Sequence, residues 1–114
     1  MARKSSSASD SLGTLILAVL ENETAHGYAI AAKIRALSDH KFTAGEGTLY
    51  PALRKLEAEQ HIHSEWIISP SGPAKREYSI TDQGRKELER RRQEWQTYRD
   101  SVDLILTNKP IHEP

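Results

Sequence analysis

The chain has 114 residues, of which 37% are hydrophobic and 28% charged, and this favours one soluble globular domain. Cysteine is absent, which excludes disulfides and thiolate chemistry and fits a reducing cytoplasm, and no apolar run reaches the length of a membrane span. The 16 Lys and Arg equal the 16 Asp and Glu, so a nucleic-acid partner would require a local cluster of basic side chains.

The N-terminal third of the sequence predicts an arm and two helices. Residues 1–9 are polar and Ser-rich, which favours a flexible arm, and Ser9 or Asp10 can cap the helix that follows. The apolar face of this helix recurs at helical spacing and consists of Leu12, Leu15, Ile16, Val19 and Leu20. A second helix is expected from about His26 to Leu37, with Ile30, Ile34 and Leu37 as its apolar positions.

A third helix is expected to end near Gln60, and its start is ambiguous. Thr43 and Glu46 have the spacing of a capping box, whereas Pro51 suits a first helical turn and makes Thr48 an equally good cap. We therefore expect a loose turn over residues 45–48 and a firm helix after it. The inner face of this helix should consist of Leu49, Leu53 and Leu56.

Two strand-like stretches follow, at residues 62–68 and 77–80. Alternation places Ile62, Trp66 and Ile68 on one face of the first stretch, and Tyr78 and Ile80 on one face of the second. Residues 69–74 between them are rich in Ser, Pro and Gly. The pattern predicts a β-hairpin with a long, mobile tip.

The last predicted element is a long helix capped by Thr81 and running to about Thr107. Apolar side chains with a period of 3.5 residues, interrupted by Arg91, indicate a seam that packs along another helix. We expect the seam to pair two chains through Leu88, Trp95, Tyr98, Val102 and Ile105.

The order of three helices, a hairpin and a long helix is typical of a winged helix-turn-helix protein, an α+β fold that is mostly helical. We expect the winged helix-turn-helix domain at residues 10–81, a C-terminal dimerisation helix at 82–107 and a tail at 108–114.

Three sequence motifs resemble the PadR family of transcriptional regulators. They are His26-Gly27-Tyr28, the stretch Gly47-Thr48-Leu49-Tyr50-Pro51-Ala52-Leu53, and Tyr78-Ser79-Ile80-Thr81-Asp82-Gln83-Gly84-Arg85. The pair Leu56-Glu57 and Trp95 add to this resemblance, which covers about residues 12 to 106. The short C-terminal region is similar to that of the smaller PadR subfamily.

The resemblance implies a winged-helix homodimer that pairs through its C-terminal helix and represses transcription at palindromic operators. The resemblance also implies control by a small effector, often aromatic or phenolic, as in some members of the family. This chain departs from the family pattern at Ala44-Gly45-Glu46, which places an acidic residue close to the expected DNA, and in its neutral total charge.

Residues for DNA contact are expected on the third helix and on the wing. Hydroxyls and cations outside the inner leucine face suit phosphate and base-edge contacts. The candidates are Thr48, Tyr50, Arg54 and Lys55 on the helix and Lys75 and Arg76 on the wing. The alternatives are that Thr48 is only a cap, that Tyr50 only packs against the second helix, and that Lys75 and Arg76 are an ordinary solvated pair.

The aromatic residues of the last helix allow two compatible interpretations. Trp95 and Tyr98 can form the core of the dimer, because large aromatic side chains at seam positions bury much area. They can also line a pocket at the dimer axis, where two Trp95 rings would stack on a flat ligand.

Other classes of function have little support in the sequence. There is no catalytic constellation, no phosphate-binding glycine loop and no sign of a cofactor, so an enzyme is not expected. His61, His63 and Glu65 share one strand face, but without a fourth ligand they favour a polar surface over a metal site. A winged-helix module that docks a protein instead of DNA is the alternative to the repressor, since the total charge is neutral.

Overall fold

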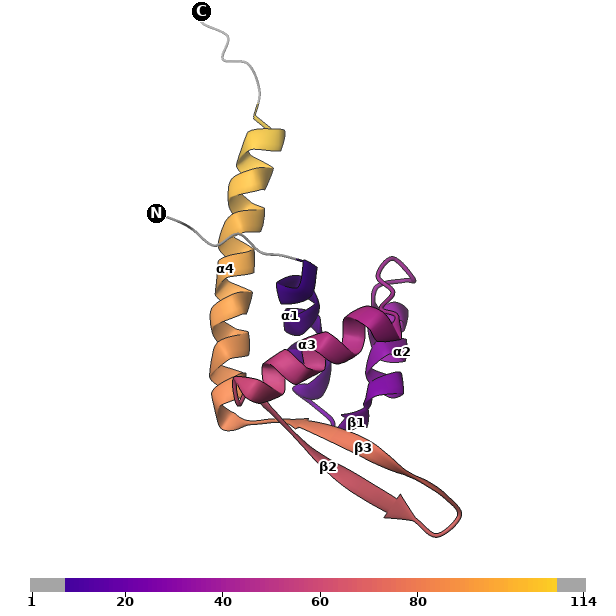
Figure 1. The fold of residues 1–114 in the computed structure, drawn as a ribbon. Coiled ribbons are helices and arrows are strands. Elements are labelled where there is room, and N and C mark those ends of the chain that lie inside the picture. The colour runs from indigo at the N-terminus through magenta and orange to yellow at the C-terminus, as the bar shows by residue number, and fades with distance from the viewer. Residues whose placement is uncertain (1–7, 109–114) are drawn as a thin grey trace, which may run out of the picture.

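The computed structural model describes residues 8–108, which form four helices and a small antiparallel sheet. The helices are α1 (Ala8–Leu20), α2 (Gly27–Leu37), α3 (Glu46–Ala58) and α4 (Asp82–Leu106), and the strands are β1 (Ala25–His26), β2 (Ile62–Ser69) and β3 (Gly72–Ile80). Helices α1, α2 and α3 form one body, β2 and β3 project from it as a wing, and α4 extends past it along α1 (Figure 1). This is the predicted winged helix-turn-helix architecture.

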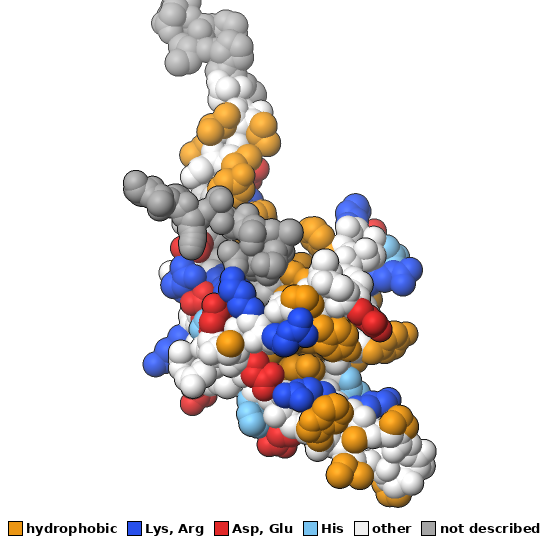
Figure 2. All heavy atoms as spheres, viewed as in Figure 1, with side chains coloured by type: hydrophobic (Ala, Val, Ile, Leu, Met, Phe, Trp, Pro, Cys, Tyr) orange, Lys and Arg blue, Asp and Glu red, His pale blue; other side chains and the backbone are white. Residues whose placement is uncertain are grey.

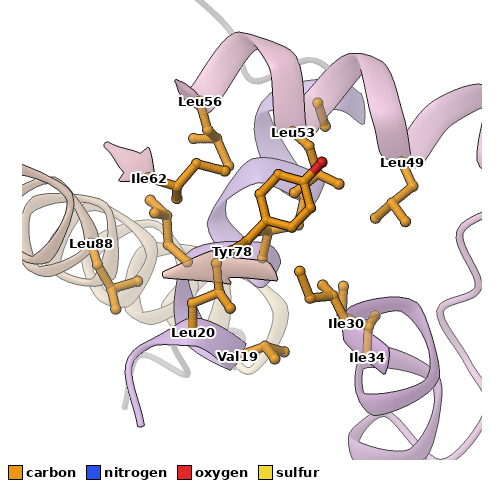
Figure 3. Close-up of a cluster of buried hydrophobic side chains, with 13 residues drawn as sticks. Val19, Leu20, Ile30, Ile34, Leu49, Leu53, Leu56, Ile62, Tyr78 and Leu88 are labelled. Carbon is orange, nitrogen blue, oxygen red and sulfur yellow. The ribbon is translucent and has the colours of Figure 1, made fainter. Parts of the chain in front are cut away.

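One core joins the helices, β2 and β3, and Ala25 of β1 packs against it. Ile16, Leu17 and Leu20 from α1 are fully covered, together with Ile30 from α2 and Leu53 from α3. Figure 3 shows that the side chains of the inner face of α3 converge with Ile62, Tyr78 and Leu88 from the wing and α4. The predicted inner face of α3 is confirmed, because Leu49, Leu53 and Leu56 are all buried.

The sheet contains one strand more than the two-stranded wing that we predicted. The two residues of β1 pair with β3, with Ala25 opposite Tyr78 and His26 opposite Glu77, so that β3 is central. A strand of two residues is too short to show alternation, and sequence analysis placed His26 in the second helix. The pairing anchors the base of the wing beside the start of α2.

The hairpin tip is short instead of long. The strands continue to Ser69 and Gly72, which pair with each other, and the connecting turn contains only residues 70–71. The Ser69 Oγ atom accepts a hydrogen bond from the Ser71 backbone N–H at 3.3 Å. A register shift after Ile67 places two residues of β3 opposite Ile68, and this accommodates the irregular sequence near the tip.

The expected helix starts differ from the structure. Helix α1 begins at Ala8, before the expected caps Ser9 and Asp10, and the rest of the predicted arm lies outside the described residues. Helix α3 is capped by the backbone of Gly45 and not by Thr48 or a capping box. The Thr48 hydroxyl instead donates to the Gly45 carbonyl oxygen at 3.2 Å, so the turn over residues 45–48 belongs to a regular helix.

Two expected apolar faces are only partly covered. Leu37, at the end of α2, is 74% exposed because the helix extends past the core there. On the wing, Ile62 is buried, but Trp66 and Ile68 on the same predicted face are exposed. The strands extend farther than the helices beneath them, and residues near the tip therefore lose their cover.

Candidate nucleic-acid interface

Helix α3 crosses the front of the molecule in Figure 1 and presents its outer face to solvent. Its leucines fix this orientation, because their burial turns Thr48, Arg54 and Lys55 outward, and all three are exposed. Added Cβ atoms at Gly45 and Gly47 would meet nothing within 4 Å, so the first turn is also open. The outer face of α3 can therefore approach a large, flat or grooved partner.

Tyr50 faces α2 rather than open solvent. It is half-buried, and a Cβ atom at Gly27 would lie 2.7 Å from its hydroxyl oxygen. The glycine of the first sequence motif is thus required by the tyrosine of the second, since any side chain at residue 27 would displace that ring. The structure supports the packing interpretation of Tyr50, and a DNA contact by its hydroxyl stays a prediction.

The wing carries the two predicted basic residues, which have different surroundings. Lys75 is exposed, and none of the described residues forms an ion pair with it. Arg76 bends toward the base of the wing, where its Nε donates to the Ser64 Oγ at 2.8 Å and its Nη2 lies 3.7 Å from Oε2 of Glu57. The alternative of an ordinary solvated pair therefore does not describe Arg76.

The joint between the wing and α4 explains the third sequence motif. The Thr81 hydroxyl donates to the Gln60 carbonyl oxygen at 2.7 Å and accepts from the Gly84 N–H at 2.9 Å, which confirms the predicted cap. A Cβ atom at Gly84 would overlap the His61 carbonyl oxygen. The motif thus holds the start of α4 against the turn after α3.

Leu88 lies in the core of the single chain and not in an exposed seam. It is 2% exposed and packs with residues of α1, α3 and the wing. Arg91, which interrupts the seam pattern, donates from Nη1 to the Thr14 Oγ1 at 3.1 Å. The seam prediction is therefore wrong for Leu88, because α1 of the same chain covers this part of α4.

The four remaining seam residues lie on the part of α4 that extends beyond α1. Trp95, Tyr98 and Ile105 are exposed and Val102 is half-buried. The Trp95 and Tyr98 ring centroids are 6.0 Å apart, with their planes tilted by 36°. Leu104 and Leu106 are also exposed, so the last turns of α4 carry several uncovered apolar side chains.

Charge is distributed locally rather than in excess. Residues 8–81 contain seven Lys and Arg against nine Asp and Glu. Figure 2 shows basic side chains along α3 and at the base of the wing, mixed with acidic and apolar ones. Any affinity for phosphate must therefore come from the placement of a few cations and not from the net charge.

Two of the residues considered as metal ligands, His63 and Glu65, lie on the surface of the wing. His63 Nε2 and Glu65 Oε2 are 3.2 Å apart on the exposed face of the wing, and within residues 8–108 no three potential metal ligands come together. In the same range, no helix combines the length and apolar character needed to cross a bilayer.

Comparison with known proteins gives the family. The sequence model described as "Transcriptional regulator PadR-like family" matches residues 16–90, well over half of the chain. This chain belongs to the PadR-like family of transcriptional regulators. The resemblance inferred from the three motifs is thereby confirmed, and the family is one of regulators and not of enzymes.

Solved structures and a curated relative agree with this PadR-like assignment. A PadR family transcription regulator from Clostridium difficile R20291 is 31% identical with a TM-score of 0.74, over 83% of this chain and 97% of that one. The protein smu.1704 of Streptococcus mutans UA159 is 28% identical with a TM-score of 0.77, over 98% and 100%. The transcriptional regulator YqjI of Escherichia coli K12 is 29% identical over 73% of this chain but only 38% of its own length.

The PadR-like match extends over some elements and not others. Residues 16–90 include α2, α3, the wing and the buried start of α4. The match ends before Trp95 and the exposed part of α4. The family match therefore does not extend to the exposed part of α4.

Proposed function

We propose that this PadR-like regulator binds DNA as a homodimer and represses transcription from a pseudo-palindromic operator. The observation that carries the proposal is the outer face of α3, which presents Thr48, Arg54 and Lys55 to solvent beside a wing that carries Lys75 and Arg76. An exposed helix of this kind fits the major groove, and its cations suit phosphate and base-edge contacts. Lys75 and Arg76 on the wing would contact the backbone beside it.

The dimer would form through the exposed part of α4. Trp95, Tyr98, Val102 and Ile105 offer an apolar stripe with a period close to that of a coiled coil. Exposure of such an apolar surface to water is unfavourable, and a second copy of the helix would bury it. Two-fold pairing would then place two α3 helices about one DNA turn, or about 34 Å, apart.

An aromatic effector would act at the same place. Trp95 and Tyr98 are close enough for a flat ligand to contact both rings, and two copies would meet at the dimer axis. A ligand that favours one angle between the α4 helices would change the spacing of the two α3 helices and release the operator. A regulator that binds chromosomal DNA would act in the cytoplasm, as expected from the sequence.

The test is a gel-shift titration of the protein on the DNA upstream of its own gene, over a salt series. Wild type should bind specifically, with an affinity that falls steeply as salt rises. Arg54→Ala and Lys55→Ala should each weaken binding about tenfold and reduce the salt dependence by about one phosphate per contact removed. Lys86→Ala is the matched control, since Lys86 is an exposed cation on the face of α4 opposite Gly84 and Leu88.

Two results of the titration would contradict specific DNA binding. Absence of specific binding at low salt would contradict the proposal and favour the alternative, a winged-helix module that docks a protein partner. Equal losses in Lys86→Ala and Arg54→Ala would indicate a general charge effect and no specific interface. Quenching of Trp95 fluorescence by aromatic compounds, in a Trp66→Phe background, tests the effector site.

A further inference from the structure

We propose that Glu57 of α3 is a positioning residue that aims Arg76 of the wing at the DNA backbone. The inference rests on the proposed function and assigns a role to an acidic side chain beside the interface. Glu57, Ser64, Trp66 and Arg76 form a group that we call the wing clamp. Its members come from α3, β2 and β3, so it connects the helix that would read DNA to the hairpin that would grip the backbone.

The wing clamp holds the Arg76 guanidinium on three sides. Ser64 Oγ donates to Glu57 Oε2 at 2.7 Å and accepts from Arg76 Nε at 2.8 Å. Arg76 Nη2 lies 3.7 Å from the same Glu57 oxygen. The guanidinium carbon lies 5.4 Å from the centroid of the Trp66 ring, which is within the range of a cation–π contact.

The strand register explains why these residues meet. Trp66 is directly opposite Arg76, and Ser64 is directly opposite Tyr78. Alternation places all four on one face of the hairpin, and Tyr78 is buried in the core under α3. The face that carries Arg76 is therefore the one turned toward Glu57.

The clamp leaves Arg76 able to bind a second partner. A guanidinium has five N–H donors, and only the Nε donor is engaged by Ser64, while Glu57 is an ion-pair partner at 3.7 Å. The side chain remains 42% exposed. An arginine already fixed in orientation loses less conformational freedom when it binds a phosphate than an unrestrained one does. Lys75, one residue earlier, has no such support.

The sign of one substitution separates this role from simple electrostatics. A carboxylate near DNA repels phosphate, so charge alone predicts that Glu57→Ala strengthens binding. Positioning predicts the opposite, because Ser64 loses its acceptor, Arg76 loses its ion-pair partner, and the guanidinium loses its orientation. We expect Glu57→Ala to weaken operator binding about threefold to tenfold.

Two further variants make the test specific. Glu57→Gln keeps an acceptor oxygen for Ser64, which still accepts from Arg76 Nε, and it should restore wild-type binding or exceed it. Glu46→Ala is the matched control: Glu46 is an exposed acid in the first turn of α3, and its removal should strengthen binding. Arg76→Ala should weaken binding about tenfold and make the salt dependence less steep by about one phosphate.

The gel-shift titration across salt is run on all variants, after thermal unfolding has shown that each is folded. Glu57→Ala binding as tightly as wild type, or more tightly as in Glu46→Ala, would overturn the inference and leave the proposed function intact. Wild-type protein that does not bind the operator would contradict the proposed function and with it the phosphate role of Arg76. Failure of Glu57→Gln to restore binding would also overturn the positioning role.

Discussion

The two halves of α4 carry similar sequence patterns but have opposite surroundings. In the first half Gly84 and Leu88 are buried, Arg91 contacts Thr14 of α1, and Arg92 contacts Glu21 just after α1. In the second half Trp95 is 55% exposed, and Tyr98 and Ile105 are more exposed still. The boundary between the halves is the point where α4 extends past the end of α1 (Figure 1).

This difference shows what a heptad pattern can and cannot specify. The period marks a stripe of α4 that must be covered, but it does not say whether the cover comes from the same chain or from another. Arg91 lies where the stripe of α4 passes from the part covered by α1 to the exposed part. Its hydrogen bonds to Glu87 and Thr14 satisfy a charge where the stripe faces α1, whereas the stripe beyond it is aromatic and aliphatic.

The largest expected effect is the loss of stability when a core side chain in the buried half of α4 is truncated. Leu88→Ala should lower the free energy of unfolding by about 3 kcal/mol, because it removes a core side chain and leaves a cavity among α1, α3 and the wing. Urea unfolding measures this loss. Ile68→Ala, which truncates a wing side chain that is 81% exposed, is the control and should cost under about 0.5 kcal/mol. Similar losses in both variants would show that Leu88 is not a core residue.

The second effect tests the exposed half. Trp95→Ala should weaken dimerisation by about 2 kcal/mol, or roughly thirtyfold in the dissociation constant, because an aromatic side chain at the centre of an interface contributes strongly. Sedimentation equilibrium over a range of concentrations measures the constant. Gln96→Ala, an exposed polar neighbour, should leave it unchanged. Unaltered association in Trp95→Ala would contradict pairing through this stripe.

The third effect concerns pH and the ion pairs of the buried half. Hydrogen bonds from Arg90 and Arg91 lower the pKa of Glu87 from its ordinary 4.5 to about 2. A carboxylate with a lowered pKa in the folded state stabilises the protein above pH 4.5, and this contribution disappears as the pH falls toward 2. Because Arg90 is largely exposed, solvent screens the interaction, and we expect about 1.5 kcal/mol near pH 7.

The comparison of wild type with Glu87→Gln isolates this contribution. The difference between their free energies of unfolding should be largest near neutral pH and should shrink toward acid. Asp103→Asn removes an exposed carboxylate of the same helix that does not contact Arg90 or Arg91, and it serves as the control. A difference between wild type and Glu87→Gln that stays constant down to pH 2 would show that the two arginines do not stabilise the ionised form.

Periodicity predicted the parts of the fold that the core decides. The inner face of α3 and the Thr81 cap follow from apolar spacing and capping chemistry, and the structure confirms both. Leu37 and Trp66 fit the same patterns and yet are exposed, because each lies where its element extends past its neighbours. The point at which a helix or strand extends past the elements that cover it depends on the assembled fold. It cannot be predicted from the sequence of that segment alone.

The candidate interface shows the same division. The outward residues of α3 and the basic pair on the wing were predictable from the sequence, since both follow from their elements. The role of Glu57, which appeared only as part of a family motif, was not, because its contacts with Ser64 and Arg76 join residues 7 and 19 positions away. Alternation does place Arg76 on the face of Tyr78 and Lys75 on the opposite face, but the partners of Arg76 on α3 and β2 appear only in the assembled fold.

The smallest expected effect concerns the polar contacts between the first half of α4 and Glu21, the residue that follows α1. Arg92 Nη2 donates to Glu21 Oε1 at 3.0 Å, and Arg85 Nη1 donates to the Glu21 carbonyl oxygen at 3.0 Å, so the end of α1 is tied to α4 by polar contacts. Both partners of the ion pair are more than a third exposed, and solvent and salt weaken it. A double-mutant cycle with Arg92→Ala and Glu21→Gln should give a coupling of about 0.5 kcal/mol at low salt and less at 0.5 M salt. A coupling near the cost of Leu88→Ala would mean that the polar joint, rather than the apolar core, holds α4 against the body.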